Sequence, residues 1–83
     1  MEFQKDLSGI RLYSEGEKLG WANCHYTENA VEICHVIVVP EARGQGIASK
    51  IVSEVVSEAE ADHKKIIPTC PYAAWWMTEN KKE

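Results

Sequence analysis

The segment best suited to chemistry is a short loop in the middle of the chain, where an arginine and two glycines precede a helical pattern. Gly44 and Gly46 leave the neighbouring backbone N–H groups unobstructed just before the predicted helix. Free N–H groups and the helix dipole favour an anion there, and Arg43 adds a fixed positive charge. The loop therefore predicts a di- or polyphosphate ligand, although the same glycines would also permit a plain strand-to-helix turn.

Two other side chains could take part in group transfer. Cys70 directly precedes Pro71 at the predicted start of the last helix, and thiols at helix N-termini tend to have a lowered pKa. His35 lies in the most apolar strand, on the face that Ile33 and Ile37 would share, and could act as a general base. Each has a plainer interpretation, because a free cysteine or a strand histidine is often only a core residue.

Cys24 and Cys34 are each followed by a histidine, a pattern that resembles two metal-ligand pairs. Adjacent residues in a strand point to opposite faces of the sheet, so neither pair can close on one ion. In a hairpin, Cys24 would face Ile33 and Cys34 would face Asn23, which places the two thiols on opposite sides of the sheet. We therefore expect no metal.

The hydrophobic pattern indicates the elements that must position these residues. Alternation and β-branched residues predict strands at 1–5, 10–14, 18–26, 30–39 and 65–69, joined by turns at 15–17 and 27–29. The nearly continuous apolar end of the fourth strand predicts that both of its faces are buried there. Apolar residues at helical spacing predict one helix from Ile47 to about Asp62, and Pro71 begins a second.

This order of elements defines the expected fold. It is an α/β (α+β) sandwich with a mostly antiparallel sheet, a βαβ unit in its second half and a short C-terminal helix. Because βαβ crossovers are right-handed, the strands at 30–39 and 65–69 should be parallel neighbours.

Composition limits the classes of function. A chain of 83 residues with 45% apolar residues fits one globular domain, 1–83. The net charge of −4 argues against nucleic-acid binding and against a polybasic membrane surface. The longest apolar run is too short to span a bilayer, no secretion signal is visible, and the three cysteines have no paired spacing. We expect a reduced, cytoplasmic protein.

Residues 38–48 resemble the acetyl-CoA-binding motif of the GNAT N-acetyltransferase superfamily. That motif, Arg/Gln-x-x-Gly-x-Gly/Ala, is matched by Arg43, Gly46 and Ala48. The chain is also similar to the small single-domain YjdJ-type members, through His35 before a Val-Pro strand end and through Pro-Thr-Cys-Pro-Tyr at 68–72. These matches run from about residue 31 to 76, over half of the chain.

The resemblance implies acetyl-CoA as co-substrate and an unknown amine or protein as acceptor. The acetyl group would pass through Cys70 with His35 as base, or directly to the acceptor, and Tyr72 would donate a hydrogen bond to the departing thiolate. A plainer interpretation of Tyr72 is an ordinary helix-face aromatic. The pantetheine arm would pair with the strand end, and the pyrophosphate would lie on the loop amides; the residues involved are Val36, Ile37, Val38, Arg43, Gly44, Gln45, Gly46, Ile47 and Ala48.

The chain departs from the superfamily pattern in its acceptor region. A full-size domain has two helices between its first strands and two further strands after the last helix, whereas residues 15–17 leave no room for those helices. The resemblance therefore implies an open, shallow acceptor surface. Two alternatives stay open: a non-catalytic acyl-CoA binding or sensing module, and a small interaction domain without a cofactor.

Overall fold

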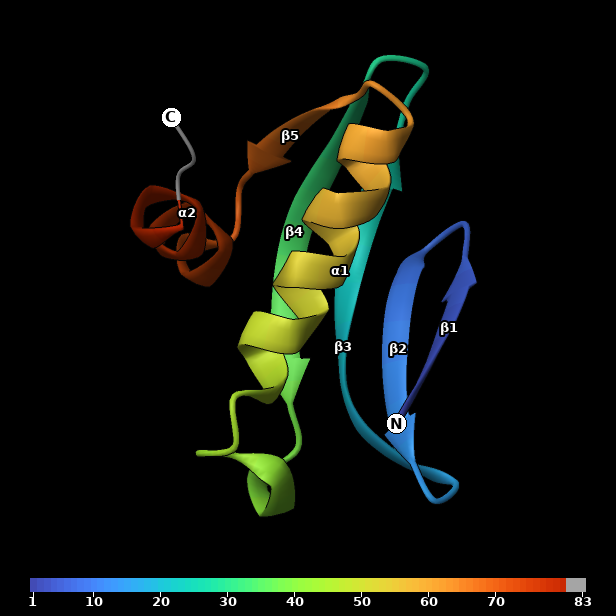
Figure 1. Ribbon diagram of the computed structural model, residues 1–83, viewed down its shortest axis with the longest axis vertical. Coiled ribbons are helices and arrows are strands. Elements are labelled where there is room, and N and C mark those ends of the chain that lie inside the picture. The colour runs from blue at the N-terminus through green and yellow to red at the C-terminus, as the bar shows by residue number, and fades with distance from the viewer. Residues whose placement is uncertain (81–83) are drawn as a thin grey trace.

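The computed structural model describes residues 1–80, which form a five-stranded sheet with a long helix across one face (Figure 1). The strands are β1 (Glu2–Asp6), β2 (Gly9–Ser14), β3 (Glu17–Tyr26), β4 (Ala30–Val38) and β5 (Lys65–Pro68). A 3-10 turn, η1 (Pro40–Ala42), and a helix, α1 (Ile47–Ala61), link β4 to β5, and a second helix, α2 (Pro71–Glu79), follows β5.

The sheet follows chain order, and this confirms the expected α/β fold. Neighbouring strands are antiparallel from β1 to β4, and β5 lies parallel to β4 at the end of the βαβ unit. The turn between β2 and β3 contains Glu15 and Gly16, both with positive φ. Two consecutive residues with positive φ form the type of two-residue turn whose twist matches that of the two strands in a hairpin.

The core lies between α1 and the sheet. One face of α1 is buried, and its central residue Ile51 is fully inaccessible, which contributes about 2 kcal/mol relative to an exposed side chain. Gly20 of β3 allows α1 to approach the sheet closely, because a Cβ at this position would lie only 3.0 Å from the Cδ1 atom of Ile51. The largest fully buried side chains are Ile10, Leu12, Ile33, Ile47, Ile51, Val52 and Val55.

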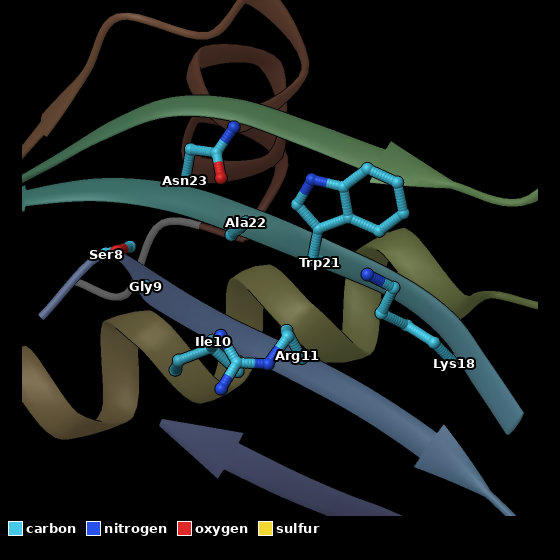
Figure 2. A pocket seen from close by; sticks show the side chains of 8 residues that line it. All are labelled: Ser8, Gly9, Ile10, Arg11, Lys18, Trp21, Ala22 and Asn23. Atoms are coloured by element: carbon cyan, nitrogen blue, oxygen red, sulfur yellow. The ribbon is translucent and has the colours of Figure 1, made fainter. Parts of the chain in front are cut away.

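The opposite face of the sheet, which we call the open face, carries polar and aromatic side chains. Figure 2 views this face with α1 behind the sheet, and it shows Arg11, Trp21 and Asn23 on the near side. Asn23 is exposed and Trp21 is half-buried. No described helix is long and apolar enough to cross a membrane.

A bulge in β4 alters the expected register. Cys24 faces Ile33 as predicted, but Asn23 pairs with His35, so the prediction that Cys34 faces Asn23 is wrong. Cys34 is the extra residue of a β-bulge, which leaves it without a direct partner on β3.

The end of β4 also differs from prediction. Val36, Ile37 and Val38 are each only half-buried, so the expectation that both faces are buried there is wrong. The reason is that β5 is short: its pairing with β4 ends at Ile33 opposite Pro68. Beyond that point β5 diverges from β4 toward α2, as Figure 1 shows.

Candidate functional site

The loop before α1 presents a set of free backbone N–H groups. Gly44 and Gly46 have φ of 80° and 75°, and no atom lies within 4 Å of a Cβ built on either residue. The first helical hydrogen bond runs from the Lys50 N–H to the Gly46 carbonyl. Within residues 1–80, the amides from 44 to 49 donate to no protein acceptor. They form an open concavity suited to a phosphate.

Arg43 holds this loop against the end of β4. Its Nε–H donates to the Val38 carbonyl at 3.3 Å, and its backbone N–H donates to the Pro40 carbonyl. The side chain is exposed, and no ion pair joins it to another described residue. The guanidinium therefore both fixes the loop and keeps a positive charge beside the free amides.

A cavity of about 250 Å³ connects this loop to α2. Tyr72, in the first turn of α2, is the residue of that helix that lines the cavity. The lining residues are Val38, Ala42, Arg43, Gly44, Gly46, Ile47, Ala48, Ser49 and Tyr72. The structure thus brings together the predicted phosphate loop, the end of β4 and one predicted transfer residue.

The end of β4 offers unpaired backbone groups beside this cavity. The Val39 N–H donates to the Leu19 carbonyl on the β3 side. Because backbone groups alternate along a strand, those of Val36 and Val38 point away from β3, toward the side where β5 has already diverged. Of these groups, the Val38 carbonyl already accepts the hydrogen bond from Arg43 Nε–H. An extended ligand could add to this edge by hydrogen bonding, as another strand would.

Cys70 occupies the N-cap position of α2, as predicted. Its backbone N–H donates to the Ile33 carbonyl at 2.9 Å, which fastens the start of α2 to the point where the strands separate. The side chain is 7% exposed, belongs to the buried core cluster and makes no capping hydrogen bond. Cys70 is therefore a buried thiol at the inner end of the β4–β5 gap.

His35 lies on the open face, which it shares with Ile37 as predicted but not with Ile33. The prediction that His35 shares a face with Ile33 is wrong, because the bulge at Cys34 reverses the alternation between them. His35 is exposed and pairs with Asn23, whereas Ile33 is buried under α1. No hydrogen bond joins His35 to Cys70 within the described part of the chain.

Sequence reasoning did not single out Glu32, which the structure places where β4 and β5 begin to separate. Its carboxylate accepts a hydrogen bond from the Thr69 hydroxyl and lies 3.9 Å from Nδ1 of His25. The sequence could have indicated this position, because neighbouring strand residues point to opposite faces and Ile33 is buried, which places the Glu32 carboxylate on the open face. Glu32 is thus a second candidate proton acceptor on this face.

Cys24 is a second buried thiol of the core cluster that contains Cys70. Burial raises the pKa of the Cys24 thiol to about 11, so Cys24 is a neutral core residue near pH 7. Among residues 1–80, no three histidine, cysteine or acidic side chains gather as metal ligands would.

Comparison with known sequences identifies the family of this chain. A sequence model described as GCN5-related N-acetyl-transferase matches residues 9–83. The chain belongs to the GCN5-related N-acetyltransferase family. No curated protein matches it significantly in a sequence search.

Solved structures of acetyltransferases share the fold. A ribosomal-protein-alanine N-acetyltransferase from Brucella melitensis aligns with a TM-score of 0.73 at 16% identity, over 90% of this chain and 62% of its own. A family member from Elizabethkingia anophelis, solved with acetyl-CoA bound, gives 0.66 at 16% identity, over 87% and 52%. An aminoglycoside acetyltransferase from an uncultured soil metagenomic sample gives 0.67 at 18% identity, over 90% and 59%.

The chain thus spans between about half and three-fifths of the length of these family members. At such low identities the likeness concerns the fold alone. Evidence for function therefore comes from the residues of the loop, the cavity and the β4 edge.

Proposed function

We propose that this chain binds acetyl-CoA and transfers its acetyl group to an amine. The observation that carries the proposal is the continuity of three features: the free amides of residues 44–49, the cavity that Tyr72 lines, and the edge of β4 beyond the end of β5. The Elizabethkingia anophelis relative, solved with acetyl-CoA bound, supports the choice of ligand.

The residues present fit this co-substrate in charge and shape. The loop amides and Arg43 bind the pyrophosphate, because both supply donors to an anion. The N–H and carbonyl of Val36 and the N–H of Val38 pair with the amides of the pantetheine arm, while the Val38 carbonyl keeps its hydrogen bond from Arg43. When bound, acetyl-CoA supplies an acetyl group activated as a thioester.

Two routes connect that thioester to an acceptor amine. In the relay route, the Cys70 thiol releases its proton to solvent and the thiolate attacks the carbonyl carbon. The bond to the CoA sulfur breaks, and the departing CoA thiolate accepts a hydrogen bond from Tyr72. The amine then attacks the acetyl-cysteine, His35 accepts the proton of the amine, and Cys70 leaves as its thiolate. In the direct route the amine attacks the thioester itself, and an open-face base, His35 or Glu32, accepts its proton.

The burial of Cys70 favours the relay route in one respect. A thiol that is 7% exposed at the inner end of the gap is shielded from bulk oxidants and reagents, while a ligand lying along β4 ends beside it. The exposure of His35 on the other face favours direct use of that base on an incoming amine.

The deciding experiment combines turnover with mass spectrometry. Acetyl-CoA is incubated with the protein and a panel of amines and peptides, and the reaction is quenched. The mass of the peptide that carries Cys70 is then measured. Acetylated amine products support an acetyltransferase. Tight CoA binding without any product would instead support the non-catalytic acyl-CoA binding module, and no CoA binding would overturn both.

A further inference from the structure

A second cavity, of about 210 Å³, lies on the open face between β2 and β3 (Figure 2). Its polar lining comes from Ser8, Arg11, Lys18, Trp21 and Asn23. The space holds a small polar group with a short chain, and it is separate from the cavity beside the phosphate loop.

Lys18 gives this cavity a free positive charge. Its Nζ atom lies 4.5 Å from the centroid of the Trp21 ring, and a cation–π contact of this kind holds the ammonium over the indole. Within residues 1–80, Lys18 forms no ion pair with an acidic side chain. The ammonium therefore keeps hydrogen-bond donors for an anion.

Arg11 adds donors of fixed geometry. One of its terminal nitrogens, Nη1, binds Oδ2 of Asp6 at 2.7 Å, and this contact lowers the pKa of the Asp6 carboxyl. The contact uses one edge of the guanidinium and holds its position on β2. Asn23 contributes an amide on the facing strand, as Figure 2 shows. Two cations and an amide around a small space are the donor set that binds a carboxylate.

The position of this cavity relates it to acetyl transfer. Trp21 and Asn23 pair with Ile37 and His35 of β4, so the cavity and the base candidate share one face. Because α1 covers the other face, an acceptor can reach the β4–β5 gap from the open face. Across β3, Arg11 on β2 lies level with Ile37 on β4, two residues from His35. With about 4.8 Å between strands and about 3.3 Å per residue along a strand, the backbones of Arg11 and His35 are separated by roughly 12 Å.

We propose that the open-face cavity binds the carboxylate of the acetyl acceptor, which is a small amine bearing a carboxylate at its far end. This inference rests on the proposed function and names its substrate class. Lys18, Arg11 and Asn23 hold the carboxylate, and the extended chain crosses β3 to present its amine near His35. The amine nitrogen then forms the amide bond, as in the transfer step above.

The test compares 6-aminohexanoate with hexylamine, which has the same carbon chain without the carboxylate. We expect acetyl-CoA turnover to favour 6-aminohexanoate in kcat/KM by about tenfold or more. Lys18→Gln should raise the KM for 6-aminohexanoate about tenfold, leave its kcat unchanged and leave hexylamine kinetics unaffected, and Lys18→Arg should restore much of the loss. Lys65→Gln removes one exposed positive charge at the far edge of the sheet and serves as the control.

A binding readout separates this inference from the proposed function. 6-Aminohexanoate is titrated into ¹⁵N-labelled protein while the Trp21 indole N–H signal, assigned through Trp21→Phe, is followed. Shifts at Trp21 and Asn23 that Lys18→Gln abolishes support the cavity, even when no amine is acetylated and the proposed function fails. Acetylation with no preference for the carboxylate, or an unshifted Trp21 signal at millimolar 6-aminohexanoate, overturns the inference and leaves the proposed function standing.

Discussion

Replacing Gly46 with asparagine tests whether the loop amides bind a phosphate, and Gly16 supplies a matched control. Gly46 and Gly16 have φ of 75° and 83°, and a Cβ on either one meets nothing within 4 Å. An alanine in this left-handed region costs about 1–2 kcal/mol, and asparagine enters it more readily. Gly46→Asn and Gly16→Asn should therefore lose similar, small amounts of stability.

Ligand binding should separate the two variants. In Gly46→Asn the new side chain would occupy the concavity over the amides of 44–49, whereas in Gly16→Asn it lies in the β2–β3 turn. A hydrogen bond to a charged group contributes about 1.5–3 kcal/mol, so losing one raises the Kd for CoA by roughly tenfold to a hundredfold. Gly16→Asn should leave the Kd unchanged.

Titration calorimetry with CoA, together with thermal unfolding of both variants, measures the two effects. Each 1 kcal/mol of lost stability lowers the Tm of a domain this size by about 4–8 °C. Equal CoA affinity in Gly46→Asn and Gly16→Asn, with both variants folded, would refute the assignment of the loop as a phosphate site.

Three further outcomes follow from single contacts. Cys70→Ala should lower acetyl transfer by roughly two orders of magnitude or more, while Cys34→Ala should not; an unacetylated Cys70 peptide with full turnover in Cys70→Ala rules out the relay. Burial raises the pKa of the Cys24 thiol from 9.0 to about 11, so only the unfolded chain ionises between those values. Below pH 9 the ionisation of this thiol has no effect on the free energy of unfolding, and between pH 9 and pH 11 its ionisation in the unfolded chain lowers that free energy by about 1.4 kcal/mol per pH unit. Urea titrations at these pH values should show that Cys24→Ala lacks this contribution. Trp76→Phe removes the 2.8 Å hydrogen bond from Nε1 to the Ser49 hydroxyl and should cost about 1 kcal/mol, and strict additivity with Ser49→Ala in a double-mutant cycle would show that the bond contributes nothing.

Periodicity predicted most of the fold. The helix predicted from Ile47 to about Asp62 is confirmed as Ile47–Ala61, because its apolar residues recur at helical spacing and α1 packs on a sheet. The start of α2 after Cys70 was also predicted correctly, since proline suits the first helical position.

The bulge at Cys34 could not be predicted, and it changes the site. Strand alternation assumes one residue on each strand per step, and nothing in the residue types around Cys34 marks an extra one. It moves His35 to the open face. The length of β5 could not be predicted from the sequence either, because the pairing of β4 with β5 beyond Ile33 depends on where α2 packs rather than on the composition of β4.

A ¹⁵N chemical-shift titration with CoA, compared with pantetheine, which lacks the pyrophosphate, tests most directly whether the loop binds a phosphate. We expect CoA to shift the amides of residues 44–49 together with Val36 and Val38, while pantetheine shifts only the β4 residues. Saturating CoA that leaves the amides of 44–49 unshifted would contradict this expectation.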